Sequence, residues 1–253
     1  FFFKQKTAYE IPKRDWSSDV CSSDLCKEKI IYRINSLYGR NGDASNNLKV
    51  MLIDCGVKHN IIRCFVNRNV EVIRVPWNYD FLKDLNANID SFDGLFISNG
   101  PGDPKMCVDT INYLKKFLES NTKSNNPKPV FGICLGNQIL ALAAGADTYK
   151  LKYGHRSQNQ PCIESGTKRC YITSQNHGFA VDAPLEGQFS TVYGQGFVSH
   201  INLNDHVVEG LKLIDRPAFS VQYHPEAAAG PHDANYLFDE FVTLLEQSKR
   251  KGR

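Results

Sequence analysis

The chain has 253 residues, 42% hydrophobic and 23% charged, which is room for one large domain with the composition of an ordinary globular protein. This balance excludes a disordered tail, a collagen and a disulfide miniprotein. A net charge of +3 is too small to indicate nucleic-acid binding, and the longest apolar runs, such as 139–144, are far shorter than the ~20 residues of a membrane span.

The first 25 residues show no usable hydrophobic period. Two blocks in them, 4–11 and 15–25, resemble an in-frame translation of a sequencing adapter. We therefore expect a non-native leader and exclude it from the fold, with a genuine disordered leader as the alternative. The expected organisation is a leader at 1–25, a remnant of an amino-terminal domain or a linker at 26–47, the main domain at 48–247 and a basic tail at 248–253.

Strand and helix patterns alternate through the next hundred residues. Short apolar runs predict buried strands, and apolar residues at helical spacing predict helices. In chain order, we expect a strand at 49–54, a helix at 60–68, strands at 70–75 and 94–98, a helix at 108–118, a strand at 129–133 and a helix within 138–144. This order indicates a parallel sheet with helices on both faces.

The pattern changes after residue 150. Four short β-like runs are separated by turn residues, at 169–174, 188–192, 207–211 and 218–222. An amphipathic helix over 232–247 closes the fold. The sequence therefore predicts an α/β fold, with a mostly parallel sheet flanked by helices and an added antiparallel β portion.

Cys134 lies in the segment Gly132-Ile133-Cys134-Leu135-Gly136, between a predicted strand and a predicted helix. This is the setting of a nucleophile elbow, where small neighbours allow a tight turn that exposes the central side chain above the sheet. The helix N-terminus favours the thiolate, the form of cysteine that attacks an amide. A small buried core cysteine is the alternative.

His224 follows the last predicted strand, and Glu226 lies two residues further on. Histidine can take the thiol proton and return it to leaving ammonia, while the carboxylate fixes the imidazole tautomer. A surface histidine in a turn set by Pro225 is the alternative. Together with Cys134, the pair predicts a cysteine–histidine–glutamate triad at the strand ends of one sheet.

Two polar segments can form a pocket beside these side chains. Residues 99–104 read Asn-Gly-Pro-Gly-Asp-Pro, in which glycine lets backbone N–H groups approach a ligand. One of these amides, with the N–H of Leu135, can stabilise a tetrahedral oxyanion. The segment 174–179 follows a predicted strand and offers amide groups to a zwitterionic substrate. An ordinary turn and a hairpin turn are the respective alternatives.

The eight cysteines include no C-x-x-C pair, which indicates free thiols in a reducing compartment and favours the cytoplasm, with organelle import left open. Five further cysteines and five further histidines lack metal-ligand spacing, so we expect no metal site. These residues are Cys55, Cys64, Cys107, Cys162, Cys170, His155, His177, His200, His206 and His232. No G-x-x-x-x-G-K-[ST] loop is present, so any ATP chemistry is expected on another chain or domain.

Cys134, His224 and Glu226 in these settings resemble the triad of the class I glutamine amidotransferases. The rest of the domain, about 48–246, is similar to the glutaminase part of carbamoyl-phosphate synthase. The segments that carry this resemblance are 54–60, 97–104, 152–161, 174–182, 222–226, 229–231 and 236–241. The fold that the resemblance implies is flavodoxin-like.

The resemblance implies hydrolysis of L-glutamine to glutamate and ammonia through a glutamyl thioester on Cys134. It implies a glutamine site at Gly100, Gly102, Leu135, Gln138, Asn176, Gly178 and Phe179, with Gly102 and Leu135 forming the oxyanion hole. The ammonia would pass to a synthetase large subunit or fused synthetase domain that makes carbamoyl phosphate for pyrimidine or arginine biosynthesis. The glutaminase needs no cofactor, and ATP and a divalent metal are expected only on the synthetase partner.

Two departures from the family pattern are visible. Asn137 stands where the family usually has histidine, and we expect at most a modest effect because this position lies outside the triad. The family also carries a sizeable amino-terminal domain, with a serine that helps bind glutamine, and only 26–47 could represent it here. We therefore expect a fragment.

Two other functions are compatible with this fold. One is an amidotransferase of another pathway, such as GMP or anthranilate synthesis, against which the segments 153–161 and 174–182 argue. The other is a silent regulatory or assembly module, against which the complete set of three triad residues argues.

Overall fold

The computed structural model of the protein describes residues 4–6, 25–34, 48–87, 91–167 and 169–251. The strands are β1 (Lys4–Lys6), β2 (Ile30–Tyr32), β3 (Leu48–Asp54), β4 (Val70–Pro76), β5 (Gly94–Ile97), β6 (Val130–Ile133), β7 (Asp147–Glu164), β8 (Cys170–Asp182), β9 (Gln188–Thr191), β10 (Gly194–Asn202), β11 (Val208–Leu213) and β12 (Ala218–Val221). The helices are α1 (His59–Val66), α2 (Phe81–Ala87), α3 (Val108–Thr122), α4 (Leu135–Ala144), α5 (Tyr236–Lys251) and the short 3₁₀ helix η4 (Pro104–Met106).

The described strands form one sheet in the order β1-β2-β4-β3-β5-β6-β12-β11-β8-β7-β10-β9. Its centre, β4-β3-β5-β6-β12, is parallel throughout. Numbered along the chain, these five strands have the order 2-1-3-4-5 of a flavodoxin-like doubly wound sheet. The predicted parallel α/β fold with an added antiparallel portion is confirmed.

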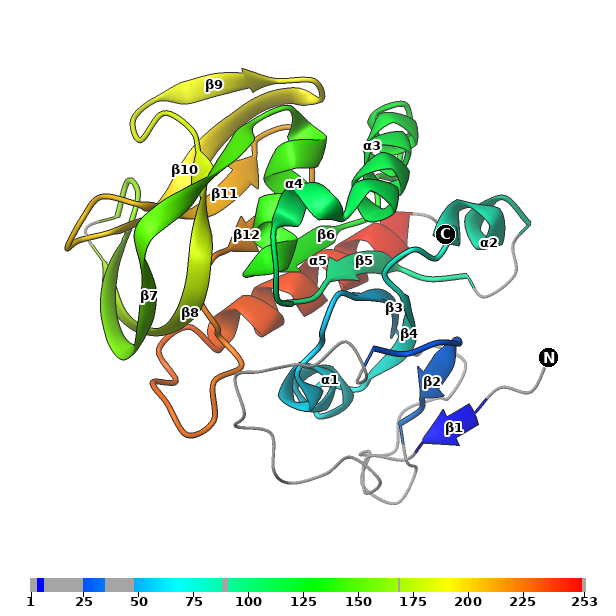
Figure 1. Cartoon of the computed structure of the whole chain (residues 1–253). Coiled ribbons are helices and arrows are strands. Elements are labelled where there is room, and N and C mark those ends of the chain that lie inside the picture. Colours follow the sequence, from blue (N-terminus) through cyan, green and yellow to red (C-terminus); the bar gives the residue numbers. More distant parts are fainter. Residues whose placement is uncertain (1–3, 7–24, 35–47, 88–90, 168, 252–253) are drawn as a thin grey trace.

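Helices cover both faces of the parallel centre, as Figure 1 shows: α3 and α4 lie on one side, and α1 and α5 on the other. The alternation along β3 explains this arrangement. Val50 and Leu52 pack into a cluster with α1 and α5, whereas Met51 and Ile53 pack into a second cluster with α3 and α4. A strand that is buried on both faces reads as a continuous apolar run, which is why the sequence predicted it.

The antiparallel portion differs most from the sequence-based expectation. β7 and β8 form a long hairpin whose paired residues run from Asp147 and Asp182 to Ile163 and Cys170. The sequence predicted only the beginning of β8 and missed β7, because half of this ribbon faces solvent and its buried face carries polar side chains. The polar segment 174–179 was expected after a strand, and it lies within β8 instead.

The two ends of the main domain also differ from the prediction. Residues 248–251, expected as a basic tail, form the last turn of α5, where positive side chains are favoured by the helix dipole. Residues 26–34 pack on the domain: β2 pairs with β4, and the backbone N–H of Cys26 donates to the Asp54 carboxylate. The rest of 26–47, and the leader apart from 4–6 and 25, lie outside the described residues, so their assignment stays a prediction.

Among the residues that the structure describes, no helix is both long enough and apolar enough to cross a lipid bilayer.

Candidate active site

The loops that follow β3 and β5 meet at the carboxyl ends of the parallel strands. Strand order reverses between these two strands, and such a switch point is where doubly wound sheets form a ligand crevice. The Lys58 N–H donates to Asn99 Oδ1 at 3.1 Å, and Asn99 Nδ2 donates to the Gly56 carbonyl at 3.0 Å. These bonds lock the two loops together beside the end of β6.

Cys134 lies at that end, between β6 and α4, in a left-handed conformation with φ 56° and ψ −103°. Such a backbone is costly for a non-glycine residue and is typical of strained functional turns. The glycines on either side are sterically required. A Cβ on Gly132 would lie 2.5 Å from the Gly136 carbonyl oxygen, and one on Gly136 would lie 2.2 Å from that of Ile97. The predicted strand–elbow–helix geometry is therefore present.

Replacement of Gly136 by alanine is expected to destabilise the fold by about 3 kcal/mol, because the new methyl group meets backbone that cannot move aside. Thermal and denaturant unfolding measure the loss. Gly178→Ala is the matched control, since a Cβ there meets nothing within 4 Å. Equal stability of the two variants would show that the turn does not require its glycine.

His224 follows β12, and its imidazole lies between the Cys134 elbow and Glu226. Its Nδ1 lies 2.8 Å from Glu226 Oε1, and its side chain lines the same cavity as the Cys134 thiol. All three side chains are buried. Burial has the largest effect on the pKa of His224 and lowers it, but the negative charge of Glu226 and the Cys134 thiol together raise this pKa to about 9. The structure thus brings the Cys134 sulfur close to the imidazole and the carboxylate, which lie far from it in the sequence.

Lys58 is a fourth charged group at the triad, and sequence reasoning missed it. Its Nζ lies 3.6 Å from Glu226 Oε1 and 3.3 Å from His224 Nδ1. Burial raises the pKa of the Glu226 carboxyl, but the charges of His224 and Lys58 outweigh it and lower this pKa. Lys58 directly precedes α1, where no local pattern separates it from an ordinary surface lysine.

A cavity of about 270 Å³ opens in front of Cys134. Of the expected glutamine-site residues, it is lined by Gly100, Gly102, Gln138, Asn176, Gly178 and Phe179. The side chain of Leu135 is buried, so it is the backbone N–H of Leu135 that can serve the site. Leu135 is the first residue of α4, and an N–H at this position has no acceptor within the helix. Gly102 has φ 95°, and a Cβ there would meet nothing within 4 Å, so this backbone faces open space. The two expected oxyanion-hole residues therefore lie at the cavity and at the elbow.

Strand β8 forms one wall of this cavity and contacts each part of the site. The Cys134 thiol lies 3.9 Å from the Asn176 carbonyl, to which it donates. The His224 N–H donates to the Ser174 carbonyl at 2.9 Å. Gln138 Nε2 donates to the Phe179 carbonyl at 2.9 Å. The position of β8 therefore sets the shape of the pocket.

Asn137, the departure from the family pattern, lies behind the elbow and is fully buried. Its Nδ2 donates to Gln222 Oε1 at 3.1 Å, and its Oδ1 accepts from Ser220 at 2.8 Å. These bonds connect α4 to the end of β12 and do not reach the cavity. Asn137 therefore stabilises the packing behind the elbow and does not line the glutamine site.

Comparison with known proteins agrees with this geometry. The family model described as glutamine amidotransferase class-I matches residues 51–244. The chain belongs to the class-I glutamine amidotransferase family. It is 50% identical over 202 residues to the carbamoyl phosphate synthase small chain of Streptomyces coelicolor, covering 78% of this chain and 50% of that protein. It is 51% identical over 206 residues to the multifunctional protein CAD of Squalus acanthias, covering 81% of this chain and 8% of that protein.

The fold is also similar to a solved structure named as a GMP synthase protein of Thermoplasma acidophilum. The TM-score is 0.65 at 21% identity, covering 82% of this chain and 98% of that one. This likeness shows the fold alone. The chain spans about half the length of the small chain and about a tenth or less of the multifunctional proteins that it matches.

Proposed function

We propose that this protein hydrolyses L-glutamine to glutamate and ammonia and that the ammonia serves carbamoyl phosphate synthesis. The observation that carries the proposal is the Cys134 thiol, raised on a strained elbow at a helix N-terminus and sharing one cavity with His224, whose Nδ1 is bonded to Glu226. The cavity in front of the thiol is polar and small enough for an amino acid.

In the first step, the Cys134 thiolate attacks the side-chain amide carbon of glutamine. The N–H groups of Gly102 and Leu135 stabilise the oxyanion, and His224 donates a proton to the leaving nitrogen, so that ammonia departs and a thioester remains. His224 then takes a proton from water, which attacks the thioester and releases glutamate and the thiol. Glu226 holds the imidazole in place and stabilises its positive charge.

The proposed partner is a synthetase, on a separate large subunit or fused in one chain, that combines the ammonia with bicarbonate and ATP. The support is the similarity to small chains and to multifunctional proteins. ATP and a divalent metal would act only on that partner, while Cys134, His224 and Glu226 supply the glutaminase chemistry without a cofactor. Pyrimidine or arginine biosynthesis would use the product. We place the protein in the cytoplasm, where buried free thiols such as Cys55 and Cys162 stay reduced.

The experiment is an assay with glutamine labelled with ¹⁵N at the side-chain amide, with and without a carbamoyl-phosphate synthase large subunit. We expect labelled ammonia from the chain and labelled carbamoyl phosphate from the mixture. Ammonia that is released but not incorporated would point to another amidotransferase pathway. No hydrolysis in either case would contradict the glutaminase and favour a silent module.

Replacement of Glu226 by glutamine is expected to lower kcat by less than loss of His224 does, and by far less than the ~10⁴-fold that a carboxylate-to-amide change costs in a serine-protease triad. The reason is Lys58, whose Nζ lies 3.6 Å from Glu226 Oε1 and would keep an amide oxygen facing the imidazole. Steady-state kinetics measure the change. In the double variant with Lys58→Met, this orientation is lost and a larger fall should follow. An equal fall with and without Lys58 would refute the role given to this lysine.

A further inference from the structure

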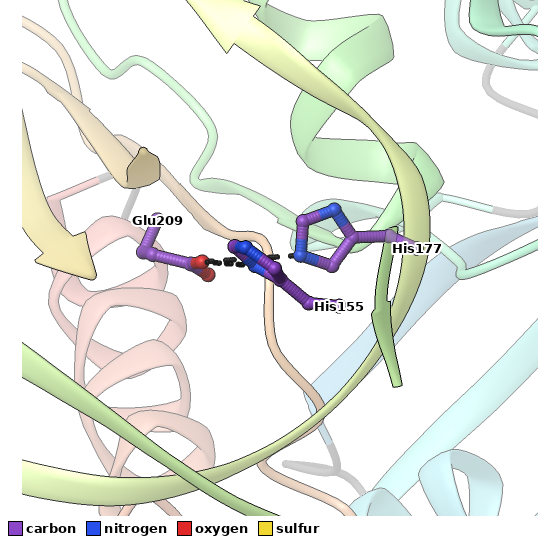
Figure 2. Close-up of side chains that lie close together, drawn as sticks. All are labelled: His155, His177 and Glu209. Carbon is purple, nitrogen blue, oxygen red and sulfur yellow. Dashed lines mark ion pairs between the residues drawn. The ribbon is translucent and has the colours of Figure 1, made fainter. Parts of the chain in front are cut away.

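A polar cluster lies buried behind the pocket wall formed by β8. His155 of β7 is directly opposite His177 of β8, and Glu209 of β11 completes the group that Figure 2 shows. His155 Nδ1 lies 2.8 Å from Gln175 Oε1 and 3.3 Å from Glu209 Oε1, and its Nε2 lies 2.7 Å from Asp205 Oδ2. The proposed mechanism uses none of these side chains.

The cluster and the glutamine pocket share strand β8. Gln175 contacts the cluster while Asn176 and Gly178 line the cavity, and His177 takes part in both; His155 and Glu209 do not line the cavity. His177 Nδ1 also donates to the Phe179 carbonyl at 2.8 Å. The position of the pocket wall therefore depends in part on His155 and Glu209, which do not line the cavity themselves.

The proton positions follow from the partners. His177 Nδ1 donates to the Phe179 carbonyl, which can only accept, while its Nε2 lies 3.1 Å from Gln175 Oε1; burial lowers the pKa of His177 to about 3 and favours its neutral form. His155 has acceptors at both ring nitrogens, and its hydrogen bond to Glu209 raises the pKa of His155 to about 9 despite burial. The cluster thus contains one imidazolium, faced by Asp205, Glu209 and neutral His177.

Ligand atoms of His155, His177 and Glu209 all lie within 4.8 Å of one another, so the group must also be tested as a metal site. Zinc with bonds of ~2.0 Å would hold tetrahedral ligands roughly 3.3 Å apart. Here the 2.8 Å from His155 Nδ1 to Gln175 is a direct hydrogen bond, whereas His177 Nε2 is 3.8 Å from Glu209. The 3.3 Å between His155 Nδ1 and Glu209 Oε1 fits a metal or an ion pair, and the direct hydrogen bond to Gln175 favours the ion pair.

We propose that His155 and Glu209 are positioning residues for glutamine binding, acting as a buried ion pair that holds β8, and with it Asn176 and Gly178, in the binding geometry. Burial raises the pKa of the Glu209 carboxyl, and the bonds to His155 and Asn202 oppose this and favour the carboxylate. Among the described residues Glu209 Oε2 has no hydrogen-bond partner, so any charge is balanced through Oε1, which faces His155. Loss of either partner leaves the other charge buried and uncompensated. The proposal rests on the glutaminase function.

The test is the kinetics of glutamine hydrolysis by His155→Gln and Glu209→Gln, with the synthetase partner present. We expect KM for glutamine to rise about tenfold or more, because β8 shifts, and kcat to fall by a smaller factor, because α4 and β12 hold Cys134 and His224 in addition to their bonds to β8. The double variant should raise KM no further than either single variant, since one interaction is lost. Unchanged KM in both single variants would overturn the proposal.

One control variant, one milder variant and a second readout separate this effect from general damage to the fold. Glu240→Gln removes a carboxylate whose partner Lys212 is also on β11 but at an exposed ion pair, and it should leave KM unchanged. Asp205→Asn removes only the half-exposed partner of His155, and we expect it to raise KM by less than the buried variants do. It tests the proposal if the buried variants do not fold. If the unaltered protein does not hydrolyse glutamine, the proposed function fails, and NMR still tests the ion pair.

The NMR readout is the ¹⁵N signal of the imidazoles, assigned by its loss in His155→Gln. Both nitrogens of His155 should be protonated at pH 7.5 in the unaltered protein, and one should lose its proton in Glu209→Gln. A neutral His155 in the unaltered protein, or one equivalent of zinc retained through purification, would overturn the ion pair.

Discussion

Replacing Cys134 by serine is expected to lower kcat for glutamine hydrolysis by at least about a thousandfold while leaving the fold intact. A hydroxyl is a far weaker nucleophile than a thiolate at neutral pH, and the helix N-terminus cannot ionise it. The change is nearly isosteric at a buried site, so the melting temperature should stay close to that of the unaltered protein. Ammonia release and thermal unfolding are the two measurements.

Cys170→Ser is the matched control for this experiment. Cys170 is an exposed free thiol at the start of β8 and faces no part of the cavity, so its replacement should leave hydrolysis unchanged. Trapping gives a second readout: an electrophilic glutamine analogue should label the unaltered protein and Cys170→Ser, but not Cys134→Ser. Glutamine hydrolysis that persists in Cys134→Ser would assign the nucleophile to another residue.

Replacing His224 by asparagine is expected to lower kcat by about a hundredfold or more, because it removes the imidazole that shares the cavity with the Cys134 thiol and is paired with Glu226. Asparagine keeps a polar side chain of similar reach next to Glu226 but cannot accept and return a proton near neutral pH. Steady-state kinetics with glutamine measure the loss, and circular dichroism checks the fold.

His232→Asn is the corresponding control, since His232 is exposed in the loop before α5. Its kcat should match that of the unaltered protein. If the two variants lose activity equally, the effect does not come from proton transfer at the triad.

The sequence determined the centre of this fold because its elements are locally encoded. Strands that are buried on both faces appear as apolar runs, and the glycines beside Cys134 mark a turn that needs small residues. The same information predicted the elbow, His224 and Glu226 as candidate groups. Each of these signals lies within a few residues of the chain, which is the range over which periodicity and turn chemistry act.

Other parts of the site left no such local signal. The buried face of the β7–β8 hairpin carries His155, Gln175 and His177, which a sequence pattern assigns to a loop because strands are recognised by apolar alternation. Lys58 likewise looks like a surface lysine until the loops after β3 and β5 are packed together. Polar groups in an interior are stable only when their partners are present, and these partners come from distant segments.

Local patterns in the chain thus identify the side chains that could do the chemistry and the parallel sheet that holds them. That these side chains meet follows from the packing of the whole domain. Cys134 and His224 come together because β6 pairs with β12, and the Cys134 N–H bonds to the Val221 carbonyl at the end of that pair. Strand order is set by the burial of both sheet faces and by backbone pairing over the whole domain, and no local stretch of sequence contains that information.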